Sequence, residues 1–222
     1  MTRRKPGEAA RQVLRSEYAT RRAVLVARLA DFARMWREAS EEDLFAELAF
    51  CLLTPQTGAR KCDSAVSQLR ETGLLWRGTN GEIARALRHR VRFHNHKAEY
   101  LVEARRTFSD GGRIAVRPVL SPRGTPYLTR EWLVRNVSGL GYKEASHFLR
   151  NVGLGQDLAI LDRHILRNLV ACAVMRKLPT ALTPWKYLEI EASVREFSAE
   201  VGIPMGELDL LLWSKETGEI FK

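Results

Sequence analysis

Hydrophobic side chains recur every three to four residues along nearly the whole chain, which is the spacing of one face of an α-helix. The pattern is clearest late in the chain, where apolar residues fall at intervals of 3, 4, 3 and 4: Tyr187, Ile190, Val194, Phe197 and Val201. A long helix is also predicted over about 8–38, a segment rich in Ala, Arg, Leu and Glu. We find no alternating strand pattern and no internal repeat, so the sequence predicts an all-α protein.

Capping and breaking residues divide the rest of the chain into shorter helices. Ser40 precedes three acidic residues and is expected to cap a helix that ends at Thr54-Pro55. A turn is expected over 77–81 and a loop over 92–96. Further helices are predicted over about 59–71, 82–89, 97–108, 129–137, 142–152, 162–174 and 204–215.

The segment from Pro118 to Pro126 contains three prolines and a glycine, which favours a loop. We take 118–126 as the approximate boundary between two helical lobes of a single unit that covers residues 1–222. With 222 residues, 45% of them hydrophobic, the chain has enough apolar side chains for one large domain or two small lobes.

Charge narrows the class of partner. The net charge is +10 and the pI is about 9.9, which favours a polyanionic partner without identifying it. No apolar run reaches the roughly 18 residues that a membrane span needs, and no apolar signal core follows the charged segment Met1–Pro6. We therefore expect a soluble, cytoplasmic protein, monomeric by default.

The three cysteines, Cys51, Cys62 and Cys172, are scattered and form no Cys-x-x-Cys pair. This favours buried thiols in a reducing compartment over disulfides, zinc or an iron–sulfur cluster. His94 and His96 are two positions apart with no third ligand nearby, which is a poor metal site. The sequence therefore indicates no metal and no cofactor.

A Gly-x-Gly turn, Gly139 to Gly141, separates the predicted helices 129–137 and 142–152. In a helix–hairpin–helix, glycines let the backbone approach a DNA phosphate, and N–H groups from the turn to Tyr142 point at it. Such contacts carry no sequence information. The alternative is an ordinary helix–helix turn that happens to contain two glycines. The basic charge favours the DNA-binding interpretation.

Lys143 follows the turn directly, and Asp162 stands at the start of the next predicted helix. A lysine amine can attack the anomeric carbon of a nucleotide and form a Schiff base, after which the strand can break by β-elimination. A nearby carboxylate lowers the barrier because glycosidic cleavage builds positive charge on the sugar. Alternatively, Lys143 is a solvated charge or a phosphate contact, and Asp162 only an N-cap.

These two motifs together resemble the helix–hairpin–helix (HhH-GPD) DNA glycosylases. The resemblance places Lys143 on the lysine nucleophile of that superfamily, Asp162 on its invariant acid, and His164 on a histidine expected near the DNA phosphates. The segment Leu52–Thr57 is similar to the loop whose polar side chain fills the gap left by a flipped base, a role that falls to Gln56.

Within the superfamily the chain most resembles the short, archaeal-type 8-oxoguanine DNA glycosylases, from about residue 40 to the end. It has neither the C-terminal cysteine cluster of iron–sulfur relatives such as endonuclease III nor room for an extra N-terminal β-domain. The most specific matches are Trp132–Asn136, Lys143–Gly153, Leu208–Leu210, Trp213 and Lys222.

The resemblance also implies a base pocket, because an enzyme that acts on a base must flip it out, stack on it and read its edge. Phe93 and Trp213 fall on the two aromatics that sandwich the damaged guanine; the alternative is that both are core aromatics. Lys222 falls on a C-terminal lysine whose terminal carboxylate accepts hydrogen bonds from the guanine edge. Asp209 falls on a further acid beside the pocket, or else on the helix surface.

The sequence thus predicts a bifunctional DNA glycosylase/AP lyase that excises 8-oxoguanine from duplex DNA through a lysine Schiff base. Two alternatives remain open. One is a glycosylase/lyase for oxidised pyrimidines, and the other is a non-catalytic helix–hairpin–helix module that only binds DNA.

Overall fold

A computed structural model describes residues 7–222 of the chain; the charged segment expected at Met1–Pro6 lies outside them. Nearly all regular structure in this range is helical, which confirms the all-α class. None of the described helices has the length and apolar character needed to cross a membrane. The helices are α1 (Glu8–Glu38), α2 (Glu41–Leu53), α3 (Ala59–Glu71), α4 (Leu74–Arg77), α5 (Asn80–Leu87), α6 (His94–Thr107), α7 (Val116–Leu120), η1 (Ser121–Arg123), α8 (Pro126–Asn136), α9 (Tyr142–Asn151), α10 (Arg163–Ala171), α11 (Pro184–Val201) and α12 (Met205–Thr217).

One small β-hairpin interrupts the helices. Strand β1 (Ser109–Asp110) pairs antiparallel with β2 (Arg113–Ile114). The two residues between them, Gly111 and Gly112, have φ angles of 54° and 78°, as a tight two-residue hairpin turn requires. Strands of two residues are too short to show an alternating pattern, so no strand is predicted here from the sequence.

The loop predicted over 118–126 is wrong, because its prolines lie inside helices. Pro118 is the third residue of α7, Pro122 the second residue of η1, and Pro126 the first residue of α8. A proline is tolerated in the first turn of a helix, where its missing N–H would have no intrahelical acceptor. The loop predicted over 92–96 is also too long, since α6 begins at His94.

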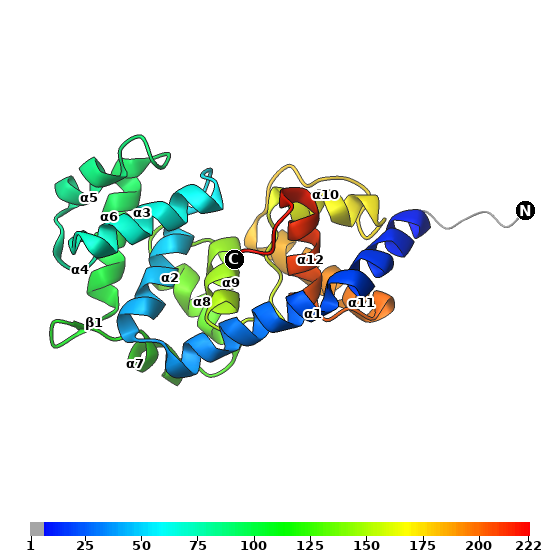
Figure 1. Cartoon of the computed structure of the whole chain (residues 1–222), viewed down its shortest axis with the longest axis horizontal. Coiled ribbons are helices and arrows are strands. Elements are labelled where there is room, and N and C mark those ends of the chain that lie inside the picture. Colours follow the sequence, from blue (N-terminus) through cyan, green and yellow to red (C-terminus); the bar gives the residue numbers. More distant parts are fainter. Residues whose placement is uncertain (1–6) are drawn as a thin grey trace, which may run out of the picture.

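The buried apolar side chains form two clusters. One runs from Leu44 to Leu158 and contains the inner faces of α2 to α9. The other combines α1 residues from Leu14 to Phe32 with residues 159–212. We propose that these clusters mark the two lobes, which change over at Leu158–Ala159 and not within 118–126. Helix α1, blue in Figure 1, runs along both parts of the molecule.

A buried ion pair joins the two parts behind the hairpin. Arg130 of α8 is 1% exposed, and its Nη1 and Nη2 lie 2.6 and 2.8 Å from the carboxylate oxygens of Glu191 in α11. Arg130 also donates to the hydroxyl of Ser146 in α9, and Glu191 accepts a hydrogen bond from the N–H of Ala159. The ion pair and these two hydrogen bonds therefore connect α8 and α9 to the chain segment that leads from Ala159 to Asp162.

Candidate active site

The helices α8 and α9 and the five residues between them form the predicted hairpin. Gly139 has φ +85°, a left-handed conformation that favours glycine, and a Cβ there would overlap the ring of Tyr100. Gly141 caps α9 in an extended conformation, and no side chain caps the helix. The backbone N–H groups in the first turn of α9 thus have no side-chain cap, as an anion-binding helix end requires.

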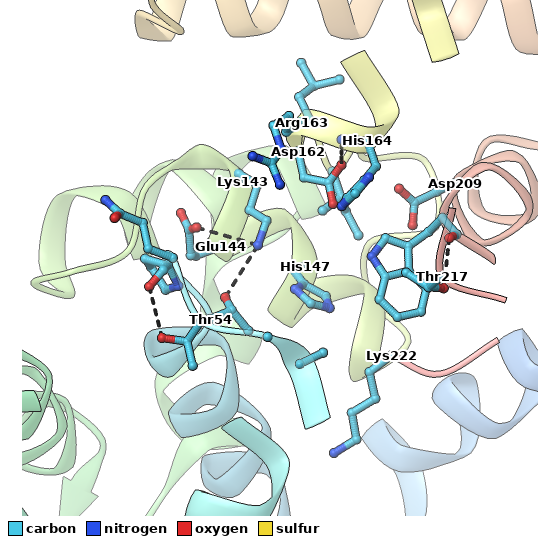
Figure 2. A pocket seen from close by; sticks show the side chains of 18 of the residues that line it. Thr54, Lys143, Glu144, His147, Asp162, Arg163, His164, Asp209, Thr217 and Lys222 are labelled. Atoms are coloured by element: carbon cyan, nitrogen blue, oxygen red, sulfur yellow. Dashed lines mark hydrogen bonds and ion pairs between the residues drawn. The ribbon is translucent and has the colours of Figure 1, made fainter. Parts of the chain in front are cut away.

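Lys143 is the second residue of α9, and its side chain is 22% exposed. Its Nζ lies 3.4 Å from the hydroxyl of Thr54 and 3.7 Å from a carboxylate oxygen of Glu144. The ammonium group is therefore held between the end of α2 and its own helix. Figure 2 shows both interactions at one side of a cavity.

Asp162 is the N-cap of α10. Its Oδ1 accepts hydrogen bonds of 2.8 Å from the backbone N–H groups of His164 and Ile165. Both bonds use the same oxygen, so the second carboxylate oxygen is not needed for capping. The carboxylate is fixed in place by the helix that it caps, and capping therefore does not compete with a catalytic role.

One cavity of about 910 Å³ brings together residues from distant parts of the chain. Lys143 and Asp162 both line it, as do five of the other residues predicted from the sequence: Gln56, His164, Asp209, Trp213 and Lys222. Its wall comes from the 54–59 segment, α9, the 160–164 segment, α12 and the C-terminal residue, so it lies where the two apolar clusters meet.

A buried lysine anchors the loop that carries Gln56. Lys97 is 3% exposed and donates to the carbonyls of Leu53 and Pro55 and to the hydroxyl of Thr57, at 2.7 to 3.0 Å. Burial lowers the pKa of Lys97 to about 8. Gln56 itself is exposed and has φ 56°. Gln56 is thus a residue in a strained backbone conformation on a firmly anchored loop.

Asp209 lies in the cavity wall as a nearly buried acid. Burial raises the pKa of Asp209 to about 6, although the nearby Arg150 opposes the shift. Arg150 is 3% exposed, and its Nη1 lies 3.6 Å from a carboxylate oxygen of Asp209. The sequence alternative of a helix-surface position for Asp209 is therefore wrong, because its side chain is only 10% exposed.

Lys222 reaches the cavity with its side chain turned toward two acids. Its Nζ lies 2.7 Å from Glu47 and 2.8 Å from Asp63, and it also lies over the ring of Phe50. Burial alone would lower the pKa of Lys222, but Glu47 and Asp63 outweigh it and raise the pKa. Glu47 also accepts a hydrogen bond from Asn151 of α9, so Lys222 contacts α2 and α3 directly and is linked to α9 through Glu47.

Four predicted residues lie outside the cavity wall: Phe93, Gly139, Gly141 and Tyr142. Phe93 is 51% exposed, has φ 57° and is absent from the lining. The side chain of Tyr142 is occupied elsewhere, since it donates to Glu131 at 2.6 Å and packs against the ring of Tyr187. Any contact of Tyr142 with a phosphate is therefore left to its backbone N–H. His164 does line the cavity, with Nδ1 3.5 Å from Glu216.

Sequence reasoning missed several residues of the wall, among them Thr54, Glu144, His147 and Arg150. A helical-face argument could have found His147, because it lies one turn after Lys143 on α9 and shares its face. The same argument could not have identified the partners of Thr54 and Arg150, which come from other parts of the chain.

A hairpin of this geometry beside a cavity with a lysine and a capping aspartate is the combination expected of helix–hairpin–helix DNA glycosylases. The family model described as 8-oxoguanine DNA glycosylase matches residues 25–203. The chain is 47% identical over 195 residues to the 8-oxoguanine DNA glycosylase/AP lyase of Fusobacterium nucleatum, covering 88% of this chain and 89% of that protein.

Solved structures agree in fold. The crystal structure of the 8-oxoguanine DNA glycosylase of Thermotoga maritima matches 97% of this chain and 100% of its own, with a TM-score of 0.85 and 33% identity. The Methanocaldococcus jannaschii 8-oxoguanine glycosylase/lyase in complex with a 15mer DNA containing 8-oxoguanine matches 95% of this chain and 100% of its own, with a TM-score of 0.84 and 33% identity. The chain belongs to the 8-oxoguanine DNA glycosylase family.

Proposed function

We propose that this protein is a bifunctional DNA glycosylase/AP lyase that excises 8-oxoguanine from duplex DNA. The observation that carries the proposal is that Lys143 and Asp162 line one cavity in a chain of this family. Neither a glycosylase for oxidised pyrimidines nor a non-catalytic DNA-binding module is supported by the named relatives.

In the first step the ammonium group of Lys143 loses a proton to water, and the neutral amine then attacks C1′ of the damaged nucleotide. A bond forms between Nζ and C1′, and the bond from C1′ to the base breaks, so that the base leaves with the electron pair and takes up a proton. The carboxylate of Asp162 stabilises the positive charge that builds on the sugar. Its fixed position on α10 means that no reorganisation is needed as this charge develops.

In the second step the sugar ring opens, and the nitrogen of Lys143 forms an imine with C1′. The imine acidifies the proton on C2′, and loss of that proton expels the 3′ phosphate by β-elimination. The products are a cut strand and an unsaturated sugar bound to the enzyme, which water releases. The step needs no oxidant and no reductant, so Lys143 can carry out both activities.

The DNA is held by its backbone. Gly139, Gly141 and the N–H of Tyr142 are proposed to bind one phosphate, and His164 another, because α9 offers an uncapped N-terminus beside the cavity. A net charge of +10 favours the association. We propose that the protein acts as a monomer. We infer a cytoplasmic site of action at the nucleoid, where the substrate DNA is.

The remaining predicted residues are proposed to bind the flipped base and fill its place. Trp213, Asp209 and Lys222 line the cavity, and Gln56 stands at its rim to replace the extruded base. Phe93 lies on an exposed position at the start of α6, and we propose that it stacks on the base when DNA binds.

A panel of duplexes tests this function. Each would carry one 8-oxoguanine, one oxidised pyrimidine or one undamaged guanine at the same position. Cleavage of the 8-oxoguanine strand well above the other two would support the proposal. Preferential cleavage at the pyrimidine lesion, or binding to all three without cleavage, would contradict it.

A further inference from the structure

His147 is a buried polar side chain with no protein partner in hydrogen-bond geometry. It is 6% exposed, and neither Nδ1 nor Nε2 reaches a described protein atom in full hydrogen-bond geometry, although the backbone of Lys222 is close enough to raise the pKa of the ring. Buried polar groups in folded proteins are nearly always paired, and each exception calls for an explanation. Its ring packs against that of Phe50 in a T-shaped arrangement, with 5.6 Å between centroids, and this contact restricts its orientation.

The surroundings of His147 point to a ligand. The residue lines the cavity together with Lys143, Trp213 and Asp209. Figure 2 shows the ring in the middle of this group in projection, with Lys143 on one side and Lys222 on the other. Because α9 carries both residues, His147 stands one turn deeper along the helix than the amine that would attack the sugar.

The imidazole is neutral at physiological pH. Burial lowers the pKa of His147 well below its ordinary value, Lys143 and Arg150 lower it further, and the backbone of Lys222 opposes the shift only in part. A neutral imidazole offers one N–H donor and one nitrogen acceptor. The edges of 8-oxoguanine carry both carbonyl oxygens and N–H groups, so whichever ring nitrogen faces the base can find a partner on it.

We propose that His147 is a specificity-determining residue that hydrogen-bonds the flipped base inside the cavity. The inference rests on the proposed function and deepens it, because it assigns the unpaired ring of His147 to the substrate. It also separates two kinds of residue on α9. Lys143 reacts with the sugar, whereas His147 contacts only the base.

The test uses the fact that an abasic site has a sugar but no base. Wild type, His147→Leu and His147→Gln would be compared for 8-oxoguanine excision and for borohydride trapping on a duplex with an abasic site. Leaving the base without its partner is expected to lower kcat/KM for excision about tenfold to a hundredfold in His147→Leu. Trapping at the abasic site is expected to stay within about twofold. The glutamine variant keeps a donor and an acceptor, and should recover part of the loss.

A second measurement does not depend on chemistry. In a Lys143→Gln background, His147→Leu should weaken binding to an 8-oxoguanine duplex and leave binding to an abasic-analogue duplex unchanged. His96→Gln is the matched control, since His96 is an exposed histidine outside the cavity wall. His96→Gln should change binding to neither the 8-oxoguanine duplex nor the abasic-analogue duplex.

Three outcomes would overturn the proposal. Unchanged excision in His147→Leu would show that the base does not need the imidazole. A parallel loss of abasic-site trapping would mean that His147 acts on Lys143 or on the fold, and melting temperatures would separate these two cases. Wild-type enzyme that traps abasic DNA but does not excise 8-oxoguanine would instead refute the proposed function, and this inference with it.

Discussion

At the scale of single residues, Asp162 combines a structural and a chemical role. Its Oδ1 satisfies two backbone N–H groups of α10, and its charge faces the cavity that contains Lys143. The two roles can be separated, because asparagine is as good an N-cap as aspartate but carries no charge.

Asp162→Asn is therefore expected to leave the free energy of unfolding nearly unchanged and to lower the excision rate about a hundredfold or more. Asp162→Ala should lose the same activity and also about 1 kcal/mol of stability. Urea unfolding and single-turnover excision measure the two effects. Full activity in Asp162→Asn would reduce Asp162 to a helix cap.

Asp209 gives a pH dependence of stability. Its pKa is about 6 in the folded protein against 3.8 for the free side chain, because burial disfavours its charge. Between these values the unfolded chain releases the proton and the folded chain keeps it, so stability falls as pH rises from about 4 to about 6. The full pKa shift corresponds to a change in the free energy of unfolding of at most about 3 kcal/mol.

Asp209→Asn removes this dependence. The free energy of unfolding of the variant minus that of wild type should therefore increase between pH 4 and pH 7, by up to about 3 kcal/mol. Urea unfolding at several pH values measures the difference. A difference that stays flat or falls over this range would show that Asp209 is not the buried acid described above.

The catalytic pair could be proposed from the sequence, but much of the wall could not. Lys143 follows a Gly-x-Gly turn and Asp162 precedes a helix, and both are local patterns. The pairing of Arg150 with Asp209, and the unpaired state of His147, depend on which distant segments fold together. For Phe93 the opposite holds. The resemblance to the glycosylase family predicted a stacking role for it, but in the structure its side chain lies outside the cavity wall.

At the scale of elements, the hairpin depends on one close approach. Gly139 has a positive φ and lies against the ring of Tyr100, whereas Gly202 has a positive φ of 71° with open space around it. The two glycines therefore separate the effect of backbone strain from the effect of crowding.

Gly202→Ala is expected to lower the free energy of unfolding by about 1 kcal/mol, because alanine is strained in the left-handed backbone conformation. Gly139→Ala should lower the free energy of unfolding clearly more, because the added Cβ would overlap the ring of Tyr100. The turn must then move away from the ring, and binding to undamaged duplex DNA should weaken severalfold. Urea unfolding and a DNA titration at fixed salt measure both effects. Equal stability losses, with DNA binding intact, would argue against the hairpin as a phosphate-binding element.

Helix positions followed from the sequence better than the connections did. The predicted bounds of α1, α2, α3 and α9 agree with the structure to within one or two residues, and α11 begins three residues before its first predicted apolar position, Tyr187. The prolines of 118–126 led to a wrong prediction of a loop, because a single sequence does not distinguish a proline in the first turn of a helix from a proline in a loop. The β-hairpin was missed although Gly111-Gly112 is a turn signal.

At the scale of the whole molecule, the cavity exists because two apolar clusters meet around it. Arg130 and Glu191 connect them, and Glu191 also holds the N–H of Ala159, three residues before Asp162. The hydroxyl of Tyr187 donates to the Ala159 carbonyl and accepts from the N–H of Leu161. The position of Asp162 relative to Lys143 therefore depends on contacts that the sequence pattern does not reveal.

Arg130→Met leaves the Glu191 carboxylate buried without its cation and is expected to destabilise the fold by about 3–5 kcal/mol. Adding Glu191→Gln should restore part of that loss, because the uncompensated charge is removed. A double-mutant cycle in urea measures the coupling. Strictly additive losses would mean that the two side chains do not act as a pair.

Lys143 is expected to form a covalent imine with the sugar of an 8-oxoguanine nucleotide. Borohydride reduction during reaction with a duplex carrying one 8-oxoguanine opposite cytosine tests it directly, with wild type and Lys143→Gln side by side. We expect a covalent protein–DNA band and strand cleavage in wild type, and neither in the variant. Wild-type excision without any trapped band, or an equal band in Lys143→Gln, would contradict the assignment of Lys143 as the nucleophile.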